Sequence, residues 1–347
     1  MRAGVNPTKG GKLIDREECH HRIVIPVHIP NEEGYFKDAY KIFEMGLFSI
    51  LKTTISKVKI SVISNKCSDE INARLLELYE KKNINELIIE EEGIGKINSI
   101  LKAIRTVEER LITITDADVL FLNGWEDAVV DVFKSFPKAG AVCPVPVFRK
   151  HFDLTRNIWF DYFFSDKIRF LPVKNPVALE QFAKSLGWEW LEKEWKDVIG
   201  TLKAKDGTIA VLGCPHFVAT YKKEVFDQLP KGNSIYKVEG DSEFLFTDEP
   251  VLKMGGYRLA TYDNYAYHLG NVHESWMDDA FINLNEVPKT LINYSYLNTL
   301  KPSKFKYYLS TKVIKKLFKN NFILRRTLAK KGLTKEQIFN FLDKKYF

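Results

Sequence analysis

The sequence predicts an α/β fold with a mostly parallel central sheet flanked by helices. Two observations predict it. Between residues 22 and 118, short apolar segments rich in Val and Ile alternate with longer segments whose apolar residues recur at helical spacing. Polar, glycine-bearing turns separate these segments. Strand–helix–strand units have right-handed crossovers, so consecutive strands should lie parallel in one sheet.

Four strands and three helices are expected in this part of the chain. The first strand is expected to be stopped by Pro26, and the fourth runs directly into Asp116. The first helix carries its apolar residues at 39, 42, 43, 46, 47, 50 and 51, which is one face of a helix. The strands are expected at residues 22–27, 58–63, 87–90 and 111–115, and the helices at 35–55, 70–82 and 94–107.

Composition divides the chain into four regions. A polar arm at residues 1–20 precedes a first half of the main domain at 21–145. A second half at 146–290 opens with an insertion rich in Trp, Phe and Tyr and returns to a strand-like segment at 209–213. The last region, 291–347, is basic and is expected to be helical, with apolar residues spaced as in an amphipathic helix.

The overall composition is that of a globular protein, with 45% hydrophobic and 28% charged residues. No apolar run approaches the length of a membrane span, and the first residues lack the hydrophobic stretch of a secretory signal. The four cysteines form no CxxC pair, which indicates free thiols and argues against a zinc site. We therefore expect a cytoplasmic protein.

The net charge of +7 comes from the tail. Residues 301–347 hold 14 Lys/Arg and two acidic residues, a net +12, which leaves −5 for the rest. The main domain therefore gives no reason to expect nucleic-acid binding. The tail has two possible roles: a helix on the inner face of the anionic membrane, or a helix packed on the main domain with its lysines in water.

The triplet Asp116-Ala117-Asp118 follows the fourth strand. Both carboxylates can reach one crevice if the strand ends there, and ligands of open parallel sheets bind at the carboxyl ends of the strands. Hard divalent cations prefer oxygen ligands and take the rest of their shell from water and phosphate. The alternative is an acidic loop that caps the next helix.

Four segments in order resemble the N-terminal half of the GT-A glycosyltransferases, family 2 in particular. They are residues 23–27, 60–65, 95–98 (Gly-Lys-Ile-Asn) and 112–118, and residues 255–259 with 267–270 resemble the family's second half. The resemblance covers about residues 20–275. It implies the Rossmann-like GT-A fold, a nucleotide-sugar donor and a Mn²⁺ or Mg²⁺ cofactor. It further implies a metal site of Asp116, Asp118 and His268, and nucleotide contacts from Pro26, Val27, His28, Asn65, Lys96, Asn98, Asp116 and Ala117.

One position departs from the family pattern. The second strand usually ends in an aspartate that binds the base, whereas this chain has Ser64 and Asn65 there. An asparagine can both donate and accept hydrogen bonds, so base binding is retained while the choice of base is open.

The resemblance also implies a catalytic base. Inverting members carry an acidic pair before the Gly-Tyr-Arg motif, and a carboxylate there takes the proton of the acceptor hydroxyl. The usual spacing falls between two clusters, one with Asp248 and one with Asp241, and Asp248 is favoured although it also suits a helix cap. On the acceptor side, His216 and Trp188 are candidates, with packed core side chains as the alternative.

The sequence therefore predicts a metal-dependent glycosyltransferase that moves a hexose-type sugar from a UDP-sugar to a glycan or lipid-linked acceptor in surface polysaccharide or glycoconjugate synthesis. The family resemblance implies that the transfer inverts the anomeric configuration. Two alternatives stay open. Asp116-x-Asp118 also fits the nucleophile motif of haloacid-dehalogenase-type phosphatases, although that motif normally lies on the first strand. A non-catalytic, glycan-binding protein on the same fold is the other.

Overall fold

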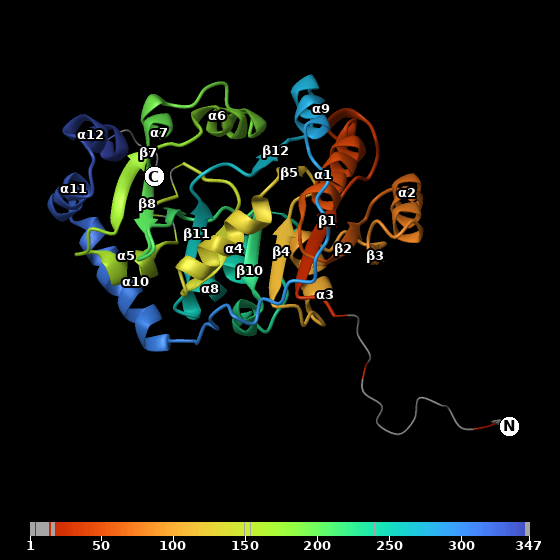
Figure 1. The fold of residues 1–347 in the computed structure, drawn as a ribbon, viewed down its shortest axis with the longest axis horizontal. Helices are drawn as coiled ribbons and strands as arrows, with labels where there is room; N and C mark the ends of the chain where they lie inside the picture. The colour runs from red at the N-terminus through yellow and green to blue at the C-terminus, as the bar shows by residue number, and fades with distance from the viewer. Residues whose placement is uncertain are drawn as a thin grey trace.

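The computed structural model describes residue 4, residue 14 and residues 18–343, except for residues 149, 153 and 239. In this part of the chain ten strands form one twisted sheet in the order β3-β2-β1-β4-β10-β6-β11-β9-β8-β7, with helices on its faces (Figure 1). The predicted fold class, a mostly parallel α/β sheet with a helical C-terminal region, is confirmed. The arm expected at residues 1–20 falls mostly outside the described residues.

The first four strands form the parallel half of the sheet, as expected. Their order places β1 between β2 and β4, and β3 at the edge. Ser68 begins α2 because its hydroxyl accepts the backbone N–H of Ile71. The strands are β1 (His21–Val27), β2 (Val58–Asn65), β3 (Glu86–Glu90) and β4 (Leu111–Thr115), and the helices are α1 (Ala39–Thr53), α2 (Asp69–Glu80) and α3 (Lys96–Ile104).

The second half of the domain extends the same sheet with mixed directions. Strand β10 (Val218–Lys222) runs antiparallel between β4 and β6 (Ala139–Cys143), and β11 (Tyr257–Thr261) is parallel to β6. The antiparallel strands β9 (Ile209–Leu212), β8 (Val198–Lys203) and β7 (Ile168–Pro172) complete that edge. Strands β5 (Val119–Phe121) and β12 (Ala266–His268) pair separately.

Short helices connect these strands. The aromatic-rich insertion supplies α5, α6 and α7, and Trp159 and Trp195 lie in the core, as the packing alternative predicted for most of its aromatic residues. The helices are α4 (Trp125–Ser135), α5 (Arg156–Tyr162), α6 (Pro176–Ser185), α7 (Lys193–Asp197), α8 (Glu249–Lys253) and α9 (Ser275–Ile282), with 3-10 turns at Gly34–Phe36 and Lys223–Gln228 and a π-helical turn at Phe244–Asp248.

The tail forms three helices, where the sequence suggested one. They are α10 (Lys304–Lys319), α11 (Asn321–Lys330) and α12 (Lys335–Asp343). Asn320 separates the first two because its side chain caps α11, and Gly332, at φ +107°, ends the second. The apolar face of this tail packs on the main domain, with Ile314 and Leu328 buried in its core. No helix among the described residues is both long and apolar enough to cross a membrane.

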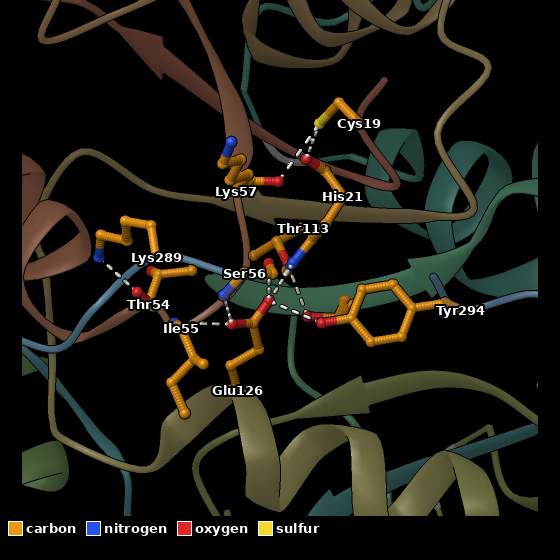
Figure 2. Close-up of polar contacts among 11 residues, drawn as sticks. Cys19, His21, Thr54, Ile55, Ser56, Lys57, Thr113, Glu126, Lys289 and Tyr294 are labelled. Carbon is orange, nitrogen blue, oxygen red and sulfur yellow. Dashed lines mark hydrogen bonds and ion pairs between the residues drawn. The ribbon is translucent and has the colours of Figure 1, made fainter. Parts of the chain in front are cut away.

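A buried polar network fixes the end of the sheet opposite the strands' carboxyl ends. Glu126 projects from the first turn of α4 and accepts hydrogen bonds from His21 (2.7 Å), from the hydroxyls of Ser56 and Tyr294, and from the backbone N–H groups of Ile55 and Ser56 (Figure 2). It is 2% exposed. Burial disfavours the charged form, but these donors outweigh it and lower the pKa of Glu126 to about 2.

The chain between α9 and α10 crosses this end of the molecule (Figure 1). Besides Tyr294, it is held by charged side chains of the sheet. The buried ammonium of Lys222 donates to the carbonyl of Asn298 (2.7 Å), and Glu224 accepts the N–H of Leu300 (2.8 Å). These contacts tie the chain that leads into the tail helices to β10 of the main sheet and to the 3-10 turn after it.

Candidate active site

The predicted nucleotide-binding loops lie at one edge of the sheet because β2, β1 and β4 are adjacent and parallel. The loop after β1 is joined to the end of β2, since His28 Nδ1 lies 2.7 Å from the carbonyl oxygen of Asn65. Asn65 is buried, and its side-chain oxygen has no hydrogen-bond partner among the described residues. Val27 is fully buried, whereas Pro26 is partly exposed.

The Asp116-Ala117-Asp118 triplet marks the point where the chain leaves the main sheet. The N–H of Asp116 donates to the carbonyl of Phe217 (2.7 Å), and the chain then turns into β5. Gly46 of α1 allows this turn to lie close to the helix, because a Cβ at that position would stand 2.7 Å from the carbonyl oxygen of Val119. The break in the strand lets the two carboxylates point into the same region.

Lys96 neutralises the first of these carboxylates. It is the first residue of α3, after Gly95 at φ +91°, and its Nζ lies 2.6 Å from Asp116 Oδ1 and 3.9 Å from Glu243 Oε1. Burial acts to lower the pKa of Lys96, but the adjacent carboxylate of Asp116 outweighs it and raises that pKa. Lys96 therefore stays charged at the site.

His268 faces the second carboxylate. Strand β12 pairs with β5, which places His268 opposite Val119, and its Nε2 lies 3.4 Å from Asp118 Oδ2. Its other ring nitrogen, Nδ1, lies 2.9 Å from the hydroxyl of Ser185, at the end of α6. Burial raises the pKa of Asp118, and the nearby imidazole of His268 opposes that rise.

Asp118 and His268 are suited to hold a divalent cation. Mg²⁺ sites of this kind use one or two protein groups, with water and phosphate oxygens as the other ligands. Burial of the Asp118 carboxylate also favours a cationic partner. Within the described residues no three His, Cys, Asp or Glu side chains are arranged to hold a metal, because Asp116 is paired with Lys96. Two of the three predicted ligands therefore lie together, and the third does not join them.

The two candidate bases differ in exposure. Asp248 is fully buried; its Oδ1 lies 2.6 Å from Arg258 and 3.2 Å from His216 Nδ1. Asp241 is exposed, before the π-helical turn. A π-helical turn holds one residue more than an α-helical turn. The π-helical turn follows Asp241 and ends at Asp248. Its extra residue changes the spacing along the chain, which is a local reason why spacing singles out neither aspartate.

The remaining predicted residues have other contacts. Asn98 holds the loop at residues 230–238, since its side chain exchanges hydrogen bonds with the backbone of Ser234 (2.9 Å each way). Trp188 is 37% exposed and its ring lies 5.3 Å from that of Phe148. His216 is 32% exposed, one residue from the Phe217 carbonyl that holds Asp116. Nucleotide or acceptor contacts by these residues stay predictions.

The sequence did not indicate Ser185 or Glu243 as parts of the site. Ser185 lies 83 positions before His268 in the chain. Glu243 lies between the two acidic candidates and is brought near Lys96 by the fold. The only available signal for Glu243 was its place in an acidic segment; Ser185 carried none.

The fold and the site define a GT-A protein whose ligand-binding edge carries a carboxylate–histidine pair and a lysine. The model of glycosyl transferase family 2 matches residues 23–229, and the chain belongs to this family. Membership leaves the haloacid-dehalogenase alternative without support, because the triplet lies on the fourth strand of a glycosyltransferase domain.

Solved structures with a similar fold are distant in sequence. One is TarS residues 1–349 from S. aureus (11% identity, TM-score 0.41, 75% of this chain and 69% of that chain). Others are the mannosyltransferase PcManGT from Pyrobaculum calidifontis with GDP-Man and Mn²⁺ (13%, 0.41, 90% and 73%) and GalNAc-T7 with UDP, GalNAc and Mn²⁺ (14%, 0.45, 92% and 52%). No curated protein matches the sequence significantly. The family assignment rests on the sequence match.

Proposed function

We propose that this glycosyltransferase moves a hexose-type sugar from a UDP-sugar to a glycan or lipid-linked acceptor, with inversion and with Mn²⁺ or Mg²⁺, in surface polysaccharide or glycoconjugate synthesis. The observation that carries the proposal is the Asp118–His268 pair beside Lys96, at the carboxyl edge of the parallel strands. A nucleoside diphosphate needs such a concentration of cationic and metal-binding groups, because its phosphates carry the charge to be neutralised.

Each group at this edge has a role in donor binding. Asp118 and His268 would hold the cation, which when bound neutralises charge that builds up on the departing nucleotide. Lys96 supplies a fixed positive charge at the N-terminus of α3, where a helix already favours anions. The unpartnered side-chain oxygen of Asn65 can accept an N–H of the base.

The reaction also needs a base for the acceptor. The acceptor oxygen forms a bond to the anomeric carbon, the bond from that carbon to the diphosphate breaks with its electron pair on the leaving oxygen, and the hydroxyl proton goes to the base. Asp248 is fully buried, so we assign the proton to His216, whose Nδ1 lies 3.2 Å from Asp248 Oδ1. Exposed Asp241 is the alternative base.

Nucleotide binding tests the donor half of this proposal. We expect UDP to raise the melting temperature in the presence of Mn²⁺, and Asp118→Asn and His268→Gln to abolish the metal-dependent part. Glu77→Gln, an exposed carboxylate on α2, is the matched control. Failure of every nucleoside diphosphate to bind, with and without metal, would contradict the proposal.

Donor hydrolysis tests the chemical half. Asp118→Asn should abolish turnover of the UDP-sugar. His216→Gln and Asp241→Asn distinguish the two candidate bases, because only the base variant should lose kcat with an unchanged KM for the donor. If the wild-type protein binds donor and glycan but never turns over, it is the non-catalytic glycan-binding protein of the second alternative.

A further inference from the structure

The outer face of α10 differs from the face that packs on the domain. Residues 305, 308, 312, 315 and 319 recur at spacings of three and four, so they share one side of the helix. The opposite side is fixed to the molecule: Ile314 is buried, and the hydroxyl of Ser310 donates to Asn157 on α5 (2.8 Å). The orientation of the outer face is therefore set by the fold, at the edge of the molecule (Figure 1).

Aromatic side chains stand in solvent on this face. Phe305 is 75% exposed and Tyr308 53%, and Phe322 follows at the start of α11 with 71%. Isolated exposed apolar residues are common on soluble proteins, but two exposed aromatics on one face of α10 and a third at the start of the next helix are more than scattered exposure explains. Their rings are placed to enter an apolar layer.

Unpaired lysines lie between these aromatics. Lys312, Lys315 and Lys319 are exposed, and none of them forms an ion pair in the part of the chain that the structure describes; the Lys312 ammonium lies 4.3 Å from the centre of the Tyr308 ring, which carries no net charge. Lys306, on the inner side, pairs with Asp161 at 2.6 Å. Residues 304–330 contain nine Lys/Arg and no acidic residue. The inner cation is therefore neutralised by the protein, whereas the outer ones need an external anion.

We propose that this face of α10, with Phe322, docks on an anionic lipid surface. Interfacial helices combine a basic surface with aromatic and apolar side chains that sink to the boundary between headgroups and acyl chains. Juxtamembrane lysines gain attraction from the negative surface potential of such membranes. Nucleic acid is a poorer fit, because the outward cations of α10 are all lysines, whereas the planar guanidinium of arginine binds phosphates in bidentate fashion.

Vesicle sedimentation tests this docking surface. The full-length protein is mixed, in about physiological salt, with vesicles of phosphatidylcholine alone or with phosphatidylglycerol added. We expect binding to the anionic vesicles only. A triple change, Lys312→Glu, Lys315→Glu and Lys319→Glu, should lower the partition coefficient at least about ten-fold, because each site reverses its charge in the surface field. Phe305→Ser with Phe322→Ser should lower it to a similar extent.

Two controls separate docking from general charge. Lys57→Glu, Lys82→Glu and Lys205→Glu change the net charge by the same amount at exposed lysines elsewhere and should leave binding nearly unchanged. Melting temperature and UDP binding should be the same in all variants, since none of these side chains is buried or at the donor site. An equal loss in the control triple would overturn the proposal. Vesicle binding that is unchanged in the Phe305→Ser, Phe322→Ser variant would also overturn it. So would vesicle binding that is abolished by duplex DNA added at the same concentration of negative charge as the lipid.

Discussion

At the scale of single residues, Lys96 pairs with one of the two carboxylates of the triplet and leaves the other to the proposed metal. Its ammonium lies 2.6 Å from Asp116, so a cation bound by Asp118 and His268 shares the site with a fixed positive charge. We predict that Lys96→Met strengthens Mn²⁺ binding to the nucleotide-free protein by about ten-fold and weakens UDP binding by a similar factor. Two unit charges about 4 Å apart near a protein surface interact by roughly 1–4 kcal/mol, and about 1.4 kcal/mol is tenfold in affinity.

Calorimetric titration of Mn²⁺ and of UDP separately measures both effects. Lys102→Met is the matched control, because Lys102 lies on the same helix and pairs with Glu90 away from the triplet. It should change neither affinity by more than about two-fold, as expected for a surface pair. If Lys96→Met changed the Mn²⁺ affinity and the UDP affinity in the same direction, the proposal that Lys96 opposes metal binding and supports nucleotide binding would be wrong.

Residue type and strand ends were sufficient to predict that Asp118, His268 and Lys96 lie at the same edge of the sheet, since each follows a strong local signal: a strand break, a strand end and a glycine-led helix start. Their roles in binding stay predictions. Pairings between distant residues were not predictable. Asp248 was singled out by its place before a helix, but its burial against Arg258 follows from the packing of β11 on that helix. Local pattern carries no information on such enclosure.

At the scale of elements, α6 of the aromatic-rich insertion positions His268, the histidine that we propose as a metal ligand. The Ser185 hydroxyl at its end lies 2.9 Å from His268 Nδ1, so Nε2 is directed at Asp118. We predict that Ser185→Ala lowers Mn²⁺ affinity about ten-fold, the lower end of what loss of such supporting hydrogen bonds costs. Ser185→Thr, which keeps the hydroxyl, should restore it. Equal Mn²⁺ affinities of the alanine and threonine variants would count against the role.

The close approach of α1 to the triplet gives a second element-scale prediction. An alanine at Gly46 would place its Cβ 2.7 Å from the Val119 carbonyl oxygen, so the helix or the turn must shift. We expect Gly46→Ala to lose about 1–3 kcal/mol of unfolding free energy, despite the better helix propensity of alanine. Urea unfolding measures it. Gly93→Ala, whose new Cβ would meet only Lys66 at 3.5 Å, should be nearly neutral.

Elements with strong periodicity were predictable and those set by tertiary contact were not. The four parallel strands and the helices between them came from apolar runs and helical spacing, and they lie within a few residues of expectation. The antiparallel edge β9-β8-β7 was not foreseen beyond β9, because β7 and β8 lie in an aromatic-rich stretch without clear alternation. The tail is divided into three helices by Asn320, which caps α11, and by Gly332, which ends it. The spacing of hydrophobic residues carries no information on such helix ends.

At the scale of the whole molecule, Glu126 joins segments that are far apart in the chain. It binds β1 through His21, the α1–β2 connection through Ser56, and the chain leading to the tail through Tyr294 (Figure 2). Because each partner comes from a different segment, the loss of this carboxylate should loosen all of them together. The network lies at the sheet end opposite the donor site, so its effect should fall on stability rather than on nucleotide binding.

We predict that Glu126→Gln lowers the unfolding free energy at neutral pH by about 3 kcal/mol, because a pKa shift from the ordinary value of 4.5 to about 2 is worth roughly that much. The folded-state pKa is depressed, so this stability is fully present above about pH 4.5 and is lost as the pH falls toward 2. Urea unfolding at pH 7, 5 and 3.5 should show the wild type and the variant converging in acid, whereas the exposed Glu77→Gln should track the wild type throughout. Parallel stability curves for Glu126→Gln and the wild type would mean that the glutamine keeps the network's hydrogen bonds and that its charge contributes little.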